Sequence, residues 1–520
     1  MRLEKLCNSL VLGSVSGDRD TEIHGIQTAS RQVQPGDLFI ALRGFTVDGH
    51  RFIPEALENG AAALVVEEEI TADVPVIRVP DTRRAMAVFS DVFYRRPTSD
   101  LKLIGITGTN GKTTTAHLIR HILQNQGQKT GLIGTINMQI GEDVFPVKNT
   151  TPEVIELQRS FRRMVDEGCS HAVIEASSHA LDLGRTRGCR FRTAVFTNLT
   201  QDHLDYHETM ENYRNAKALL FSQLGNGYAD RSVDQPLAVL NADDPASDYF
   251  ARVTPAQVLR YGIEQKADVK AENIRFHPGG TRFTLATYQG SVQVDMKMMG
   301  KFSVYNVLAA AAVALGEGVP LEDIRDSLER IRGVDGRLEQ VDNGQPFTVL
   351  VDYAHTPDGL ENVLTTIREV AQGTVFCVVG CGGDRDRTKR PLMAEIGARY
   401  SDHLVITSDN PRTEDPLRII DDMLEGVKQV PRERVTTLPD RAEAIQFCVE
   451  RARPGDMVLI AGKGHETYQE INGVRYDFDD REQAREAIKR IQALRTEESH
   501  AKNTESYYQH NQRKAHRRGI

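Results

Sequence analysis

The sequence predicts three α/β domains, and three observations support this fold class. At 520 residues the chain is too long for a single hydrophobic core. Short apolar segments alternate with helical patterns along most of it, as in open sheets of parallel strands. A glycine-rich loop between an apolar strand and a helical pattern, residues 104–114, marks the central domain as a P-loop mononucleotide-binding sheet. The C-terminal domain reads as a second, Rossmann-like α/β sheet.

The apolar segments place the strands and helices of each domain in order. In the N-terminal domain we expect strands at 37–42, 62–67 and 74–78. In the central domain we expect strands at 101–106, 172–175, 193–197 and 237–241, and helices at 115–124 and 304–315. In the C-terminal domain we expect strands at 347–352, 374–379, 403–407 and 457–461.

Polar and glycine-containing segments predict the domain boundaries. Arg95 to Asp100 reads as a linker, and Gly333 to Leu338 as a second hinge. The last segment is polar and almost without aliphatic residues, so it cannot bury enough apolar surface to offset its ordering entropy. The domains are expected at 1–98, 99–332 and 333–496, followed by a disordered tail at 497–520.

Composition narrows the class of protein. The hydrophobic fraction is 40% and the charged fraction 26%, which is typical of a globular protein. A formal net charge of −9 argues against broad affinity for nucleic acid. The six cysteines lack paired metal-binding spacing and are expected as free thiols. No signal peptide or membrane-spanning run is present in the sequence, so we expect a cytoplasmic protein without membrane insertion.

The loop Thr107-Gly-Thr-Asn-Gly-Lys-Thr113 carries the strongest functional signal. Its glycines let backbone N–H groups approach a polyphosphate, and the following helix N-terminus favours anions. Lys112 adds a point charge, and the Thr113 hydroxyl can bind Mg²⁺. Ile106 stands where the usual P-loop pattern has glycine, so the match is to a variant loop. An ordinary glycine turn between a strand and a helix is the weaker interpretation, because the lysine, the threonine hydroxyl, the preceding strand and the following helix occur together.

Two polar segments follow later strands of the same sheet. Glu175 ends an apolar strand, where a carboxylate beside a phosphate loop suits Mg²⁺. His203, beside Asp202, is a candidate ligand for a second cation. The alternative for Glu175 is a solvated glutamate at a strand end, and the alternative for the segment that contains His203 is a polar loop with capping residues. Lys217 lies in a helical pattern and, read alone, is a surface lysine.

Four polar loops follow strands of the C-terminal domain, at 352–358, 381–390, 407–413 and 462–466. Loops at the carboxyl ends of parallel strands form the crevice where open α/β folds bind ligands. Arg385 and Arg412 can bind carboxylates, while Asp409 and Glu466 can pair with an ammonium group. Because both signs of charge occur, the loops predict a zwitterionic substrate such as an amino acid.

Five motifs together resemble the Mur ligase family over nearly the whole chain up to the polar tail. They are Thr107-Gly-Thr-Asn-Gly-Lys-Thr113, Glu175-Ala-Ser-Ser-His179, Asn198-Leu-Thr-Gln-Asp-His203, Asp352-Tyr-Ala-His355 and Gly462-Lys-Gly-His-Glu466. Asp409-Asn-Pro-Arg412 is the form seen in members that add meso-diaminopimelate, whereas lysine-adding relatives usually depart from the arginine. A buried distal carboxylate needs a counter-charge such as Arg412.

The resemblance implies a role for each matching residue. ATP would be bound by Gly108, Thr109, Asn110, Gly111, Lys112, Thr113, Thr114, Asn306, Arg337 and Asp352. Mg²⁺ would be bound by Thr113, Glu175, His203 and Lys217, the last carbamylated to N6-carboxylysine. Lys112, Lys217 and His203 would be the catalytic residues. The uridine-linked muramoyl-peptide would contact Thr28, Ser30, Phe45, Thr46, Val47, Asn149, Thr150, Thr151, Ser177, Leu183 and Arg185. Diaminopimelate would contact Arg385, Asp409, Asn410, Pro411, Arg412, Gly462 and Glu466.

The resemblance also implies the reaction. The enzyme would use ATP and Mg²⁺ to join meso-diaminopimelate to the D-glutamate γ-carboxylate of UDP-MurNAc-L-Ala-D-Glu, through an acyl phosphate, in peptidoglycan precursor synthesis. Leu183 stands where some relatives carry a glutamine that touches the muramoyl-peptide. We expect a cytoplasmic monomer that binds no nucleic acid. The alternatives are the same reaction with L-lysine, another amide ligase such as folylpolyglutamate synthetase, and a non-enzymatic P-loop ATPase.

Overall fold

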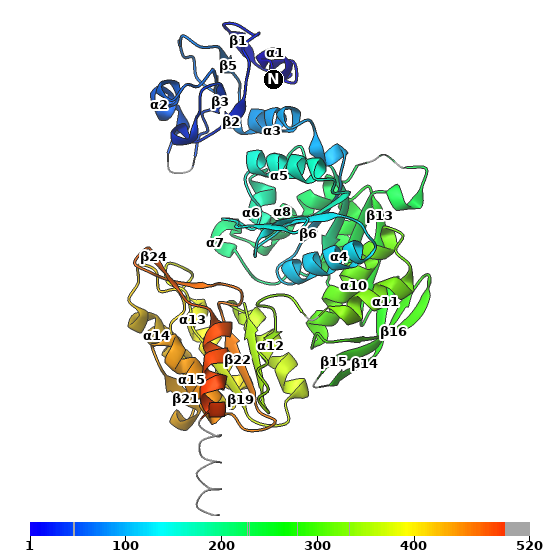
Figure 1. Ribbon diagram of the computed structural model, residues 1–520, viewed down its shortest axis with the longest axis vertical. Coiled ribbons are helices and arrows are strands. Elements are labelled where there is room, and N and C mark those ends of the chain that lie inside the picture. The colour runs from blue at the N-terminus through cyan, green and yellow to red at the C-terminus, as the bar shows by residue number, and fades with distance from the viewer. Residues whose placement is uncertain (45–46, 226, 228, 278, 332, 494–520) are drawn as a thin grey trace, which may run out of the picture. The chain divides into compact units, whose positions relative to one another are not determined.

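The structure is a computed structural model that describes residues 1–44, 47–225, 227, 229–277, 279–331 and 333–493 (Figure 1). The chain divides into two compact units. The first unit comprises 1–272, 284–294 and 305–330, and the second comprises 273–283, 295–304 and the chain from 331 onward. The predicted tail at 497–520 and two predicted site residues, Phe45 and Thr46, lie outside the described residues.

A five-stranded sheet forms the N-terminal part of the first unit, in the order β1-β5-β4-β3-β2. Its strands are β1 (Ser14–Ser16), β2 (Gly25–Gln27), β3 (Asp37–Ile40), β4 (Ala63–Val66) and β5 (Val76–Arg78). Only β1 runs antiparallel to its neighbour. The helices are α1 (Leu3–Cys7), α2 (Ile53–Glu58) and α3 (Thr82–Phe93), with short 3₁₀ turns at Ser30–Gln32, Gly49–Phe52 and Pro97–Ser99. Alternate residues of β3 and β4 enter two different apolar clusters, so both faces of this sheet are covered.

The central sheet is built around β6, which leads into the glycine-rich loop. In the first unit the strand order is β13-β12-β11-β6-β10-β7-β8-β9. Strand β6 pairs in parallel with β10 on one side and β11 on the other. The strands are β6 (Lys102–Thr107), β7 (Thr130–Ile133), β8 (Met138–Ile140), β9 (Asp143–Phe145), β10 (His171–Glu175), β11 (Phe191–Phe196), β12 (Leu237–Asn241) and β13 (Gln257–Gly262). Strands β14 (Val269–His277), β15 (Gly280–Thr287) and β16 (Gly290–Met296) continue the order beyond β13.

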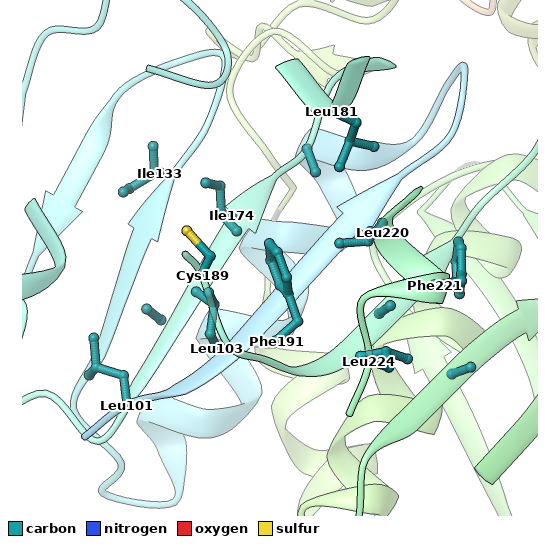
Figure 2. Close-up of a cluster of buried hydrophobic side chains, with 14 of the residues drawn as sticks. Leu101, Leu103, Ile133, Ile174, Leu181, Cys189, Phe191, Leu220, Phe221 and Leu224 are labelled. Carbon is teal, nitrogen blue, oxygen red and sulfur yellow. The ribbon is translucent and has the colours of Figure 1, made fainter. Parts of the chain in front are cut away.

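Helices connect the central strands. They are α4 (Lys112–Asn125), α5 (Val154–Asp166), α6 (Ser178–Asp182), α7 (Leu204–His207), α8 (Met210–Ser222), α9 (Ala246–Val253), α10 (Lys301–Gly316) and α11 (Leu321–Arg330), with a 3₁₀ turn at Ser232–Asp234. Figure 2 shows buried side chains from β6, β10, β11 and α8 in one apolar cluster, including Leu103, Ile174, Phe191 and Leu220. Burying each such side chain stabilises the fold by about 1.5–3 kcal/mol. This packing holds the strand ends that carry the functional loops.

A six-stranded sheet in the order β17-β18-β22-β19-β20-β21 forms the C-terminal part of the second unit. Its strands are β17 (Glu339–Gln340), β18 (Thr348–Asp352), β19 (Val375–Val379), β20 (His403–Ile406), β21 (Val435–Thr437) and β22 (Met457–Ala461). All neighbouring strands are parallel except β17 and β18. The helices are α12 (Pro357–Val370), α13 (Lys389–Tyr400), α14 (Pro416–Leu424) and α15 (Arg441–Arg451), with 3₁₀ turns at Glu425–Val427 and Arg432–Arg434. A separate hairpin joins β23 (Tyr468–Ile471) to β24 (Val474–Asp477).

The structure confirms each strand that the apolar segments predicted, to within one or two residues. Helix α4 begins at Lys112, three residues before the expected start, because the helix opens directly from the loop. The strand-rich stretch from β13 to β16 was not predicted, because its half-exposed strands lack continuous apolar runs. Among the described residues, no helix has the length and apolar character needed to cross a membrane.

Candidate active site

The glycine-rich loop joins the buried strand β6 to the N-terminus of α4. Gly108 has a φ of +149°, and a Cβ there would lie 1.9 Å from Thr197 Oγ1, so only glycine fits. Lys112, the first residue of α4, donates from Nζ to the carbonyls of Gly108 at 2.9 Å and Thr109 at 2.8 Å. The loop therefore brings a lysine ammonium and a helix N-terminus together, a combination that attracts phosphate.

The segment after β11 supports the loop. Asn198 Oδ1 accepts from Asn110 N at 2.9 Å, and its carbonyl accepts from Thr109 N at 2.9 Å. Thr197 Oγ1 donates to the Asn110 carbonyl at 2.6 Å. Two motifs about 90 residues apart in sequence are thus one structural unit, because β11 lies beside β6 in the sheet.

Glu175, at the end of β10, lies beside the start of α4. Its Oε2 accepts from Thr113 Oγ1 and Thr135 Oγ1, each at 2.9 Å, and its Oε1 accepts from Thr135 N at 2.8 Å. Hydroxyl and carboxylate oxygens in this arrangement are the donors that Mg²⁺ prefers, so the residues present fit that ion. Over the described residues there is no cluster of three or more His, Cys, Asp or Glu side chains arranged for a metal.

Lys217, on α8, is buried, with 1% of its surface exposed, so the surface-lysine reading of the sequence is wrong. Its Nζ donates to the Gly108 carbonyl at 2.9 Å and lies 4.2 Å from the centre of the Tyr213 ring. Burial, followed by the charge of Lys112, holds the pKa of Lys217 well below its ordinary value, although Asp202 acts in the opposite direction. The amine is therefore more readily neutral than an exposed lysine.

His203 lies near Lys217, because the ring of His203 is centred 6.2 Å from the Tyr213 ring that the Lys217 amine also contacts. Its ring packs edge-on against His179, with ring centres 4.7 Å apart, and its Nε2 lies 3.3 Å from Asp202 Oδ2. Burial lowers the pKa of His203 to about 4, although Asp202 raises it. At neutral pH the imidazole is uncharged, the form in which a histidine binds a metal.

Four of the predicted muramoyl-peptide residues lie together behind Glu175. Thr151 Oγ1 donates to the Glu175 carbonyl at 2.7 Å and accepts from Ser177 N at 3.1 Å. Arg185 Nη1 donates to the Thr151 carbonyl at 3.0 Å. Thr150 Oγ1 lies 3.1 Å from Thr135 Oγ1, which joins this group to the Glu175 oxygens. The group therefore forms one polar edge beside the candidate Mg²⁺ site.

Other predicted residues of the first unit are more dispersed. Asn149 is exposed, and Leu183 is the C-terminal capping residue of α6. Ser30 Oγ donates to Glu55 Oε2 at 2.6 Å. Within the described part of the chain, no hydrogen bond links Thr28 or Val47 to Ser30.

Asn306, one of the predicted ATP contacts, lies on α10 beside the loop. Its Oδ1 accepts from Thr115 Oγ1 at 3.3 Å, and the side chain lies against Gly111. The structure thus brings Asn306 and the P-loop together from positions nearly 200 residues apart in sequence. The neighbouring Tyr305 hydroxyl donates to Asp243 Oδ2 at 2.8 Å, which anchors this turn of α10.

In the second unit, the loops after β20 and β22 meet at the carboxyl edge of the sheet. Asn410 Nδ2 donates to Glu466 Oε2 at 2.8 Å. Lys463 Nζ donates to Asn410 Oδ1 at 3.1 Å and to Glu466 Oε2 at 3.2 Å. Gly462, at the end of β22, lies against the carboxylate of Asp409. These residues form a hydrogen-bonded polar group in which Lys463 offsets the charge of Glu466.

The two predicted carboxylate-binding arginines flank the loop after β19. Arg412 has a φ of +53°, and its Nη1 donates to the Gly383 carbonyl at 2.7 Å. Pro411, just before it, is buried. Arg385 is exposed and donates from Nη1 to the Asp384 carbonyl at 3.0 Å. Two guanidinium groups therefore lie around one short glycine loop.

Asp352 ends β18, with its carboxylate turned back onto the chain. Oδ2 accepts from Leu338 N at 2.7 Å, and Oδ1 accepts from Ala354 N at 2.8 Å. Burial raises the pKa of Asp352, although the charge of Arg337 opposes this shift. The Arg337 guanidinium lies 4.7 Å from the centre of the Tyr353 ring. Arg337 and Asp352, both expected to contact ATP, are thus neighbours.

Three residues that contact predicted site residues had no role assigned from the sequence. They are Thr135, Tyr213 and Lys463, which contact Glu175, Lys217 and Glu466 respectively. Lys463 lies inside the Gly462–Glu466 motif, so its position was visible although its role was not. Tyr213 is four residues before Lys217 and therefore shares a helix face with it. Thr135 follows β7 in a short glycine turn and carried no local signal beyond that.

Comparison with known proteins agrees with this geometry. A Mur ligase middle-domain model matches residues 106–314, a Mur ligase glutamate ligase domain model matches 336–464, and a Mur ligase family catalytic domain model matches 22–94. A protein of Bacillus licheniformis named UDP-N-acetylmuramoyl-L-alanyl-D-glutamate--2,6-diaminopimelate ligase is 54% identical over 489 residues, which cover 94% of this chain and 99% of the relative. The chain belongs to the Mur ligase family.

Two further similarities concern proteins of the same name. A relative from Listeria monocytogenes is 50% identical and covers 94% of this chain and 99% of its own length. A solved structure of such a ligase superposes with a TM-score of 0.68 at 35% identity, and covers 94% of this chain and 99% of its own. This Mur ligase thus has the family's three-domain α/β architecture, and it is an ATP-dependent enzyme that forms amide bonds. The exact domain boundaries stay predictions.

Proposed function

We propose that this Mur ligase joins meso-diaminopimelate to the D-glutamate γ-carboxylate of UDP-MurNAc-L-Ala-D-Glu with conversion of ATP to ADP and phosphate. The observation that carries the choice of amino acid is Arg412, whose Nη1 donates to the Gly383 carbonyl among the loops that follow β19 and β20 of the second unit. The Bacillus and Listeria relatives are both named as 2,6-diaminopimelate ligases, which supports this choice of substrate. A UDP-linked substrate and ATP place the reaction in the cytoplasm, as a step of peptidoglycan precursor synthesis.

The first half-reaction activates the acceptor. The γ-carboxylate of D-glutamate attacks the γ-phosphorus of ATP, the bond to the β-γ bridging oxygen breaks, and an acyl phosphate and ADP form. Lys112 and the backbone N–H groups of the loop hold the phosphates in line. Thr113 and Glu175 are the residues that would hold Mg²⁺. That ion would neutralise negative charge on the transferring phosphoryl group.

The second half-reaction forms the amide. A neutral amine of diaminopimelate attacks the acyl-phosphate carbonyl, and a tetrahedral intermediate forms. The intermediate loses phosphate as the C–O bond breaks, and the nitrogen gives up a proton. Exclusion of water protects the acyl phosphate from hydrolysis.

The carbamate at Lys217 is part of this proposal. A neutral lysine amine adds to the carbon of CO₂ and releases one proton, which yields a negatively charged carbamate. The lowered pKa of Lys217 supports this step, since the neutral amine is the reactive form. The new carboxylate would lie on the same side of the loop as His203, and the two would serve a second Mg²⁺.

Recognition of the amino acid follows from charge. Arg412 would form two charge-assisted hydrogen bonds with the distal carboxylate, and Arg385 would bind the other carboxylate. Asp409 and Glu466 would receive ammonium groups, and Asn410, Pro411 and Gly462 would line the site. Lysine lacks the distal carboxylate and would leave the arginine unpaired, so discrimination on the order of 10⁴-fold is expected.

The remaining substrate contacts rest on the family motifs. Asn306, Arg337 and Asp352 are proposed for ATP. Thr28, Ser30 and Val47 are proposed for the uridine nucleotide. Asn149, Thr150, Thr151, Ser177, Leu183 and Arg185 are proposed for the muramoyl-peptide. A monomeric state also stays a prediction.

One assay separates this proposal from its alternatives. Phosphate release is measured with ATP and UDP-MurNAc-L-Ala-D-Glu, with diaminopimelate and lysine supplied side by side. Turnover that depends on diaminopimelate supports the proposal. Equal use of lysine would reject the role of Arg412, and turnover without any amino acid would favour a P-loop ATPase.

A further inference from the structure

A buried guanidinium lies beneath the two loops that carry Arg385 and Arg412. Arg390, on α13, has no exposed side-chain surface. Its Nη1 donates to Glu414 Oε2 at 3.0 Å and to Asp422 Oδ2 at 2.8 Å, and its Nη2 donates to Glu414 Oε1 at 2.8 Å. We call Arg390, Glu414 and Asp422 the Arg390 cluster. A buried guanidinium depends on its carboxylate partners, because without them its charge would be uncompensated.

The cluster holds the short glycine loop at both ends. Arg390 Nη2 donates to the Gly382 carbonyl at 3.3 Å. Glu414 Oε1 also accepts from Asp384 N at 2.6 Å. Arg390 and Glu414, which pair with each other, therefore both hydrogen-bond to residues 382–384.

The same loop holds the guanidinium of Arg412. The carbonyl of Gly383 accepts from Arg412 Nη1 at 2.7 Å, and Gly383 N donates to the Asn410 carbonyl at 2.9 Å. A Cβ at Gly383 would lie 1.9 Å from the Pro411 carbonyl oxygen, so the two loops are in direct contact. Thr413 Oγ1 adds a hydrogen bond to Asp384 Oδ1 at 2.7 Å. A displacement of residues 382–384 would thus displace Arg412.

We propose that Arg390 and Glu414 are positioning residues for selection of the amino acid. They fix the Gly383 carbonyl, and this carbonyl fixes the orientation of the Arg412 guanidinium toward the distal carboxylate of the substrate. The inference rests on the proposed function, and neither residue touches substrate. Because the planar fork of arginine binds a carboxylate only in a narrow range of orientations, a small rotation removes one of two hydrogen bonds.

The test is the ratio of kcat/KM for diaminopimelate to kcat/KM for lysine in Glu414→Gln and Arg390→Lys. Glu414→Gln keeps the size of the side chain and removes its charge. We expect KM for diaminopimelate to rise on the order of tenfold, as is typical when a group that orients a ligand-binding side chain is removed. Lysine has no distal carboxylate for Arg412 to bind, so its kcat/KM should change little and the ratio of diaminopimelate to lysine should fall. KM for ATP should stay unchanged.

Arg368→Gln is the matched control for lost stability. Arg368 pairs with Asp402 Oδ2 at 2.9 Å, and Asp402 also accepts from Val375 N. This ion pair lies at the amino ends of β19 and β20, the edge of the sheet opposite the substrate loops. The Arg368→Gln variant should lower thermal stability without changing the ratio of kcat/KM for diaminopimelate to kcat/KM for lysine.

The possible outcomes are distinct. If wild type prefers diaminopimelate and both variants fold with the same ratio as wild type, the positioning role is wrong. If wild type shows no preference, the proposed function itself fails. If both variants fail to fold, Thr413→Val removes only the hydroxyl that joins the loops, and the ratio must fall in that variant for the inference to stand.

Discussion

Replacement of Arg412 by lysine tests how this enzyme recognises its amino acid. The guanidinium has five N–H donors, and in the structure Nη1 donates to the Gly383 carbonyl at 2.7 Å. Lysine keeps the positive charge but lacks the planar guanidinium. It therefore cannot donate to this carbonyl and, at the same time, donate two parallel hydrogen bonds to a carboxylate. A hydrogen bond to a charged group contributes about 1.5–3 kcal/mol. Since 1.4 kcal/mol is a factor of ten, KM for diaminopimelate should rise about 10- to 100-fold.

The assay is phosphate release, titrated once with diaminopimelate and once with ATP. Because Arg412 lies in the loop after β20 and not in the P-loop, KM for ATP should stay unchanged. Arg385→Lys is a useful comparison, since that side chain is exposed and a smaller effect is expected. Equal losses for diaminopimelate and ATP would refute the reasoning, because they would indicate general damage and not lost recognition.

Three further predictions concern buried groups. Lys217→Ala should abolish most turnover, and acetate or formate should restore part of it; wild-type activity in this variant would contradict the carbamate. Arg441→Met should lower the free energy of unfolding, measured by urea denaturation, by about 3–5 kcal/mol, because the fully buried Asp480 loses its bidentate partner. The double variant Arg441→Met/Asp480→Leu should recover most of that loss. Thiol titration of the native protein should detect one fast cysteine, Cys7, since the other five are buried, and six after denaturation.

Much of the fold could be predicted from the sequence. Strands β19 and β22 have unbroken apolar runs because both of their faces are buried, and such runs are easy to find. The glycine-rich loop was equally clear, since its glycines, lysine and threonine occur in one short stretch. The strands from β13 to β16 were missed because much of their length is exposed or half-buried, so they lack continuous apolar runs, and because they lie outside any motif.

The candidate site was only partly predictable. Glu175, His203 and Asn306 could be assigned from motifs, but their contacts depend on which strands and helices are neighbours. The burial of Lys217 was invisible locally, since its helix carries polar residues at several nearby positions. Arg390 lay within a polar segment that the sequence analysis noted, but nothing in that segment indicated that it is buried beneath a substrate loop.

The order of residues along the chain by itself determined the three α/β domains, the phosphate loop and the set of charged groups available for an amino acid. Those features depend on local periodicity, on backbone freedom at glycine and on the chemistry of single side chains. Only the tertiary structure decided which amine has its pKa lowered by burial, which carboxylate accepts a hydrogen bond from Thr113 and which carbonyl accepts one from Arg412. Desolvation and hydrogen bonding are set by neighbours about 30 to 110 positions away in the chain, which pairing of parallel strands brings together.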